Sequence, residues 1–294
     1  MRDRASLRGR ARLRAWAVAC RYGLPARLGG LLPAPTAAVA ARWAAARVAL
    51  GQRVTLGFFH RADMPPAAIA SANLAAVRAL AGVGAAAPLL AVKAPPLGFD
   101  AGLLAELAAE AGACGVGLVF DAHAAHHADA TLAAMEKLAG GPSATGAPVP
   151  LGLALPARWR RSLADARRLR DMPVAIRLVK GEWADPAGED GHVTRRFMAL
   201  AGFLAGRAAP VAVASHDADL AACALDLLQE GATPCELEQL RGLPMRQTAG
   251  VARARGVPLR TYLPFGPGWW PYALERALAR PGLGLWFLKD WLAA

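Results

Sequence analysis

The stretch IRLVKGEW, residues 176–183, places one arginine inside an apolar run and ends that run in Lys-Gly. Burying Arg177 is costly unless an anion meets its charge. Lys180 follows at the end of the same run, and Lys93 ends another. Three such cations predict one shared anionic ligand, and Gly181 lets phosphate oxygens approach the backbone closely. The sequence therefore predicts a phosphate-bearing ligand beside these residues.

Other apolar runs also contain a polar residue or end in one. The further candidates are Asp121, Ser215, His216, Glu236 and Tyr262. Any one of them alone is typical of a helix cap, a solvated loop or a hydrogen-bonded structural residue. Their convergence favours a binding site, because repeated desolvation at one place needs a common partner.

The segment HAAHH carries His123, His126 and His127, and this clustering raises the question of a metal site. Its spacing could place His123 and His127 on one helical turn. Beyond Asp121 and Asp129, however, the sequence offers no evident fourth ligand or supporting acid. We therefore interpret the segment as a solvated loop or helix start, and we predict no metal site.

Eight short strand-like runs must position these residues. They cover residues 54–58, 89–93, 116–121, 150–155, 174–179, 210–214, 234–237 and 258–263. Most are continuously apolar, as expected of strands covered on both faces, and Ala/Leu-rich segments with helical spacing separate them. This alternation predicts an α/β fold, a (β/α)8 TIM-like barrel, in which chemistry sits at the carboxyl ends of the strands.

The pattern divides the chain into two parts. Residues 1–50 precede the first strand and are predicted to form an N-terminal helical arm packed on the barrel, which takes up residues 51–294. The arginine-rich start is compatible with a targeting segment, but it lacks a long apolar core and a small-residue cleavage site. We interpret it as the basic amphipathic first helix of a cytoplasmic protein.

Composition restricts the class of partner. The formal net charge is +12, but the arginines are scattered along helical stretches such as RWRRSLADARRLR, which favours solvated helix faces over a nucleic-acid interface. Four well-separated cysteines predict reduced thiols. No apolar run is long enough to predict a membrane span. The amphipathic end, LGLWFLKDWLAA, leaves two interpretations open: peripheral contact with a membrane, or a last helix that seals the barrel.

An ordered set of motifs resembles the proline dehydrogenase family. The motifs are LLAVKAPPLGFD, LVFDAHAAHHADATL, LGLALPARWRRSLADARRL, RLVKGEW, VASHDADLAACAL, CELEQLRGLP and PLRTYLPFGPGWWPYALERALARPGLGLWFLKDWL, within residues 54–291. The resemblance implies a distorted (β/α)8 barrel with non-covalent FAD. It also implies oxidation of L-proline to 1-pyrroline-5-carboxylate by hydride transfer to the flavin, with a quinone as electron acceptor.

The resemblance assigns one group of residues to the cofactor. Arg177 would donate a hydrogen bond near the flavin N5 and O4 edge, and Lys180 and Gly181 would meet the ribityl-phosphate region. The remaining cofactor candidates are Trp183, Ser215, His216 and Glu236.

A second group is assigned to the substrate. Lys93 and Arg276 would hold the substrate carboxylate, with Asp121 orienting these cations. Tyr262 and Tyr272 would line the pocket for the proline ring and place its α-carbon over the flavin.

The departures from the family pattern concern the site itself. Glu275 stands where the family has the first arginine of a pair, and Ala279 stands where it has a glutamate. Pro156 replaces a glutamine, Ser-His-Asp at 215–217 replaces Thr-His-Asn, and His123 replaces the glutamate of a DME segment.

The change from arginine to Glu275 reverses a charge beside the predicted carboxylate pocket. Three outcomes remain open: weak use of L-proline, use of another secondary or cationic amine, or loss of catalysis. A protein of another class, a non-catalytic barrel that binds FAD or a phosphorylated ligand, is the competing interpretation.

Overall fold

The computed structural model of the 294-residue chain describes residues 31–140, 149–188, 191–278 and 282–292. The predicted helix in residues 1–30, Cys20, Ala279 and most of the loop at 140–148 lie outside the described residues. The boundary drawn at residue 50 stays a prediction.

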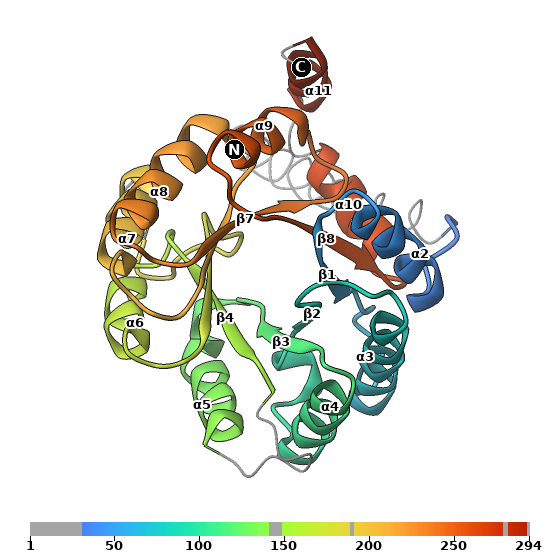
Figure 1. Cartoon of the computed structure of the whole chain (residues 1–294). Coiled ribbons are helices and arrows are strands. Elements are labelled where there is room, and N and C mark those ends of the chain that lie inside the picture. Colours follow the sequence, from blue (N-terminus) through green and yellow to red (C-terminus); the bar gives the residue numbers. More distant parts are fainter. Residues whose placement is uncertain (1–30, 141–148, 189–190, 279–281, 293–294) are drawn as a thin grey trace, which may run out of the picture.

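Eight parallel strands form a closed barrel in sequence order, which confirms the predicted fold class (Figure 1). The strands are β1 (Arg53–Phe58), β2 (Leu89–Val92), β3 (Gly117–Phe120), β4 (Leu151–Pro156), β5 (Ala175–Val179), β6 (Val211–Ala214), β7 (Cys235–Leu240) and β8 (Leu259–Phe265).

Helices surround the ring of strands (Figure 1). They are α2 (Ala37–Val48), α3 (Pro66–Ala81), α4 (Ala101–Ala113), α5 (Ala128–Ala139), α6 (Ser162–Leu169), α7 (Val193–Leu204), α8 (Ala218–Glu230), α9 (Arg246–Ala254), α10 (Trp269–Leu278) and α11 (Leu283–Leu292), with short 3₁₀ turns at Pro95–Leu97 and Ala125–His127. Thr36, Asp100 and Asp217 cap α2, α4 and α8 through side-chain oxygens that accept backbone N–H bonds.

The two faces of the strands carry different kinds of side chain. Large aliphatic residues such as Leu56, Leu90 and Leu118 are fully buried in the hydrophobic core. At one inward position, Gly57 on β1, a large polar side chain occupies the space that a side chain would need. A Cβ on Gly57 would lie 1.9 Å from the hydroxyl oxygen of Tyr262, so this position must be glycine while Tyr262 points inward.

Glu236 lies at the amino end of β7, where it forms ion pairs with Arg260 at 2.6 Å and Arg53 at 3.0 Å. Arg260 also donates to the backbone oxygens of Val54 and Ala87. The prediction that Glu236 binds the cofactor at the rim is therefore wrong: its carboxylate neutralises two arginines at the opposite end of the strands.

The last two strands are longer than predicted. β7 continues through Glu238 and Gln239 to Leu240, and β8 continues to Phe265. The sequence predicts that this strand ends at residue 237, because the polar residues Glu238 and Gln239 follow it. Both polar residues are buried, and their partners inside the fold make this possible.

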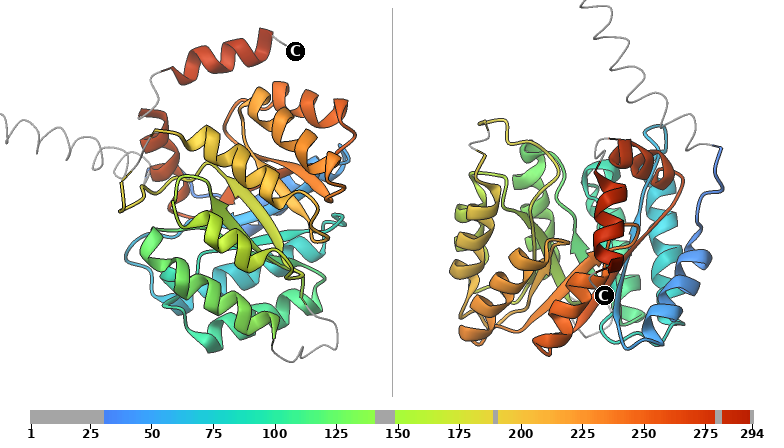
Figure 2. Two further views of the ribbon diagram at one scale, coloured as in Figure 1. Left: turned by 90° about the vertical axis from the view of Figure 1, so that its left-hand side faces the viewer. Right: turned by 90° about the horizontal axis from the view of Figure 1, so that it is seen from above.

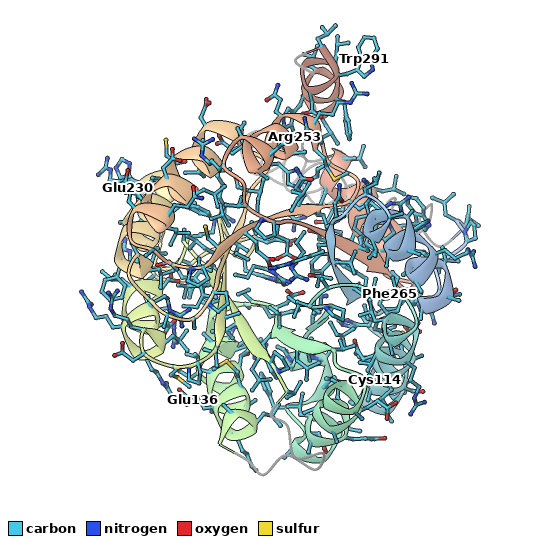
Figure 3. All side chains as sticks on the ribbon, in the orientation of Figure 1. Cys114, Glu136, Glu230, Arg253, Phe265 and Trp291 are labelled. Atoms are coloured by element: carbon cyan, nitrogen blue, oxygen red, sulfur yellow. The ribbon has the colours of Figure 1, made fainter. Side chains whose placement is uncertain are left out.

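Helix α11 lies outside the ring of helices, and its residue Trp291 points away from the barrel (Figures 2 and 3). Asp290 attaches it, since its carboxylate accepts N–H bonds from Met245, Arg246 and Gln247 at the start of α9. Along the described ranges, no helix is both long and apolar enough to cross a membrane.

Arg207 joins several segments at the amino ends of the strands. The residue is 3% exposed. It donates to the backbone oxygens of Leu169, Arg170, Met172, Val174, Ala209 and Pro210. Because Val174 and Pro210 immediately precede β5 and β6, this one side chain fixes where both strands begin.

Replacing Arg207 by methionine is expected to lower the free energy of unfolding by about 3 kcal/mol, because several buried carbonyls lose their donor. Urea unfolding measures the change. The matched control is Arg253→Met, an exposed position on α9 (Figure 3), which should change stability by less than about 0.5 kcal/mol. Equal effects of the two variants would contradict the role given to Arg207.

Candidate active site

A cavity of about 440 Å³ opens at the carboxyl ends of the strands. This is the end of the barrel where the βα loops of such folds form their sites, and the volume suits a small-molecule or cofactor site. Five aromatic side chains contribute to its wall: Phe59, Trp159, Trp183, Tyr262 and Tyr272. The cavity therefore offers flat apolar surfaces next to a small number of charged groups.

The charge of Arg177 is met by two carboxylates of the protein. Its Nε and Nη2 donate to Glu238 at 2.6 and 3.0 Å, and its Nη1 donates to Asp121 at 2.7 Å. Burial works against the charged guanidinium, but Glu238 and Asp121 more than offset it and raise the pKa of Arg177. The inference that Arg177 requires an anionic ligand is thus corrected: Glu238 and Asp121 are the anions.

Lys93 lies beside this pair. Its Nζ is 3.3 Å from an Asp121 carboxylate oxygen, donates to the backbone oxygen of Phe58 at 3.1 Å, and lies 4.3 Å from the centre of the Phe59 ring. Burial lowers the pKa of Lys93, although Asp121 works in the opposite direction. Asp121 therefore joins Lys93 and Arg177. The sequence pairs it with Lys93 and Arg276, so its contact with Arg177 is a finding of the structure.

Tyr262 completes the inner cluster from the middle of β8. Its hydroxyl donates to Asp121 at 2.9 Å and lies 3.4 Å from the Lys93 ammonium. Burial and the neighbouring Asp121 raise the pKa of Tyr262. The phenol is thereby held as a neutral donor at the floor of the cavity.

Glu182 organises the outer side of the mouth. Its carboxylate accepts a hydrogen bond from the Tyr272 hydroxyl at 3.0 Å and forms an ion pair with Arg276. Both partners lie on α10, so this loop residue ties the helix across the cavity. Glu275 is partly buried on the same helix, but it is not among the residues that line the cavity.

Lys180 points to the rim rather than into the cavity. Its ammonium pairs with Asp217 at 2.9 Å, and both side chains are more than two-fifths exposed, at 42% and 44%. Gly181 has φ +95°, and a Cβ there would lie 2.9 Å from the Cβ of Pro156. This backbone therefore requires glycine and stays bare where it lines the cavity.

His123 lines the cavity and stacks on Trp183, with ring centroids 4.6 Å apart. Its Nδ1 is buried with no hydrogen-bond partner among the residues that the structure describes. Burial, followed by the nearby His127 and Lys93, lowers the pKa of His123 to about 4. Burial and Lys93 lower the pKa of His60, another lining residue, as well.

The histidine cluster does not form a helical pair. His123 lies in a loop, while His127 ends the 3₁₀ turn Ala125–His127. Among the described residues, no group of three metal-ligating side chains comes together.

Ser215 and His216 mainly order the loop after β6. His216 Nε2 accepts the backbone N–H of Leu240 at 2.8 Å, which leaves Nδ1 to donate to Pro244 O at 2.7 Å. Ser215 is buried and bonds within its own turn to Asp217. His216 still presents part of its surface to the cavity.

The structure brings most of the predicted residues to one mouth. The cavity wall includes Lys93, Asp121, Arg177, Gly181, Trp183, His216, Tyr262 and Tyr272. Their individual roles stay predictions. Sequence reasoning missed Glu238 and Glu182, and the alternation in CELEQL, with acids two residues apart, was the available signal for Glu238.

No protein-family model matches the chain. A comparison with characterised proteins finds proline dehydrogenase 1 of Bacillus subtilis strain 168, which is 30% identical over 153 residues. Over this stretch the chain is similar to the proline dehydrogenase family, at a distant level of identity. The same enzyme of Bacillus subtilis subsp. natto is 29% identical over 153 residues. Each match covers 48% of this chain, and the chain spans about half (49%) of these relatives' length.

Solved structures show the same barrel fold. Proline utilization A from Bdellovibrio bacteriovorus, inactivated by N-propargylglycine, superposes with a TM-score of 0.72 at 17% identity, covering 84% of this chain and 32% of that one. The same protein from Corynebacterium freiburgense gives a TM-score of 0.69 at 18% identity, covering 99% and 35%. At these identities the likeness shows the barrel fold alone.

Replacing Glu238 by alanine is expected to lower the free energy of unfolding by about 3–5 kcal/mol, because it leaves the Arg177 charge buried with one carboxylate fewer. Glu238→Gln should lower the free energy of unfolding by less, since its amide oxygen can still accept a hydrogen bond from Arg177. Urea unfolding measures both. Glu230→Ala, at an exposed position on α8, is the control and should change little; an equal loss there would rule out the ion-pair explanation.

His123 is expected to make the fold acid-sensitive. Its pKa is about 4 in the folded chain against 6.5 for a free histidine. Between these two pH values the unfolded chain binds more protons than the folded chain, so the free energy of unfolding falls as the pH drops from 6.5 to 4. His123→Phe keeps a stacking ring but cannot titrate, so its stability should fall less steeply. Urea unfolding at pH values across the window, wild type against variant, measures the difference; identical slopes would contradict the shifted pKa.

Proposed function

We propose that this chain binds FAD and oxidises a cyclic secondary amine of the L-proline type to the corresponding imine. The observation that carries the proposal is the aromatic-walled cavity whose floor holds Lys93, Asp121, Arg177 and Tyr262 together, in a chain similar to the proline dehydrogenase family. L-proline itself, the substrate that the relatives' name gives, is the first amine to test.

Three features of the cavity fit a flavin. A guanidinium has five N–H donors, and three of those of Arg177 bond to Glu238 and Asp121, so two remain for a cofactor edge. The backbone at Gly181 carries no side chain, so a flat or phosphorylated group can approach it closely. Trp183 and Trp159 add aromatic surface against which a ring system can pack.

The residues that would hold the cofactor follow from this arrangement. Arg177 would donate to the ring edge, and Gly181 and Lys180 would meet the phosphate side, where the ammonium already contacts an exposed carboxylate that a phosphate can replace. The bound flavin would supply the acceptor for a hydride from the carbon next to the amine nitrogen.

The chain's own groups would bind and orient the amine. Tyr262 and Tyr272 present aromatic faces to the ring, and Asp121 fixes both the Tyr262 hydroxyl and the Lys93 ammonium. The aromatic wall and α10, tied by Glu182, would exclude water from the reacting carbon. A quinone as electron acceptor is part of the same proposal.

Purified protein should bind added FAD, as measured by quenching of flavin fluorescence, and anaerobic L-proline or a related cyclic amine should bleach the visible flavin band. Gly181→Ala should weaken FAD binding roughly tenfold, because its Cβ would press on Pro156 in a backbone that disfavours side chains. Gly250→Ala, where a Cβ meets nothing within 4 Å, is the control.

Absence of FAD binding by the wild-type chain would contradict the proposal. FAD that binds but is bleached by no amine would instead favour a non-catalytic flavin-binding barrel.

A further inference from the structure

Among the described residues, five charged side chains line the cavity: Lys93, Arg177, Asp121, Glu182 and Glu238. Arg276 on α10 does not line it but pairs with Glu182. Each of the three cations lies within ion-pair distance of at least one of the three carboxylates. Within the part of the chain that the structure describes, each of these cations already meets a carboxylate of the protein, so a substrate carboxylate would have to compete for it.

The inner cations cannot easily exchange their partners. The side chains of Arg177 and Glu238 are 6% and 3% exposed, and their bond is bidentate. Asp121 is shared between Arg177 and Lys93. A substrate carboxylate that approached Lys93 would meet Asp121 at close range in a poorly solvated place, where repulsion between like charges is strong.

The outer cation is occupied as well. Arg276 pairs with Glu182, which also accepts the Tyr272 hydroxyl, so the carboxylate is held by two groups of α10. Glu275 adds a further negative charge one residue away on the same helix. A substrate carboxylate that reached Arg276 would have to displace Glu182.

The rest of the wall suits an amine. Phe59, Trp159, Trp183 and Tyr272 line the cavity, and aromatic faces attract ammonium groups and pack on saturated rings. Phe59 already carries the Lys93 ammonium over its ring, which shows that this wall accepts such a contact.

We infer that the site selects a cyclic secondary amine without a carboxylate beside its nitrogen, in preference to the amino acid. The inference rests on the proposed function, because it requires the bound flavin to be the oxidant. In the step, the C–H bond next to nitrogen breaks and its electron pair leaves as hydride to the flavin. The N–H proton passes to solvent, and the C=N bond forms.

The test compares two amines that differ only in the carboxylate, pyrrolidine and L-proline. The FAD-loaded full chain is mixed anaerobically with each, and the second-order rate constant for bleaching of the flavin band is measured. Pyrrolidine should react at least about tenfold faster than L-proline. An equal or faster reaction of L-proline would overturn the inference while leaving the proposed function standing.

A variant pair assigns the selectivity to the ion pair at the mouth. Glu182→Gln keeps an acceptor for Tyr272 but removes the charge that occupies Arg276, so the ratio of the two rate constants should shift toward L-proline by roughly tenfold. Glu230→Gln, remote on α8, should leave the ratio as in the wild type. An unchanged ratio in Glu182→Gln would refute the part given to Glu182.

A flavin that binds but is reduced by neither amine would contradict both the inference and the proposed reaction. Isothermal titration of the oxidised, FAD-loaded chain with propionate gives a readout that does not depend on turnover: binding of this simple carboxylate should be absent in the wild type and present in Glu182→Gln. Binding by the wild type would also overturn the inference.

Discussion

Arg177 and Glu238 form a bidentate ion pair inside the barrel, and the surrounding interior is built to accommodate it. Two charges removed from water are tolerated only when their remaining donors and acceptors find partners. Asp121 and the hydroxyl of Thr55, which donates to Glu238 at 2.9 Å, supply them. Arg177 and Glu238 lie on β5 and β7, Thr55 lies on β1, and Asp121 directly follows β3. These four groups therefore connect four strands of the barrel and fix the floor of the cavity.

The barrel keeps its charges in two separate groups along its axis. Glu236 with Arg53 and Arg260 neutralises the amino end, and the cluster around Arg177 neutralises the carboxyl end. Only the second group borders the cavity. The first neutralises buried charge within the fold, and the second does the same while forming the floor of the cavity.

The order and number of strands were readable from the sequence because continuous apolar runs separated by helical segments have few other folded solutions. Lys93 and Asp121 could be placed at the mouth for the same reason. The error at Glu236 and the omission of Glu238 have one cause: two acids two residues apart face the same interior at different depths, and depth depends on the tilt and length of β7. Glu182 could not be assigned because it lies in a loop, where no periodicity indicates which way a side chain points.

Gly57 and Tyr262 occupy one shared space across neighbouring strands, since the phenol fills the volume that any side chain at position 57 would need. Evolution therefore cannot change these two positions independently. A bulkier residue on β1 demands a shorter one on β8, and that exchange would remove the hydroxyl that contacts Asp121. Only a chain that keeps glycine at position 57 can therefore keep this tyrosine. A chain that had replaced the glycine would need two substitutions, one on each strand, to place the phenol there again.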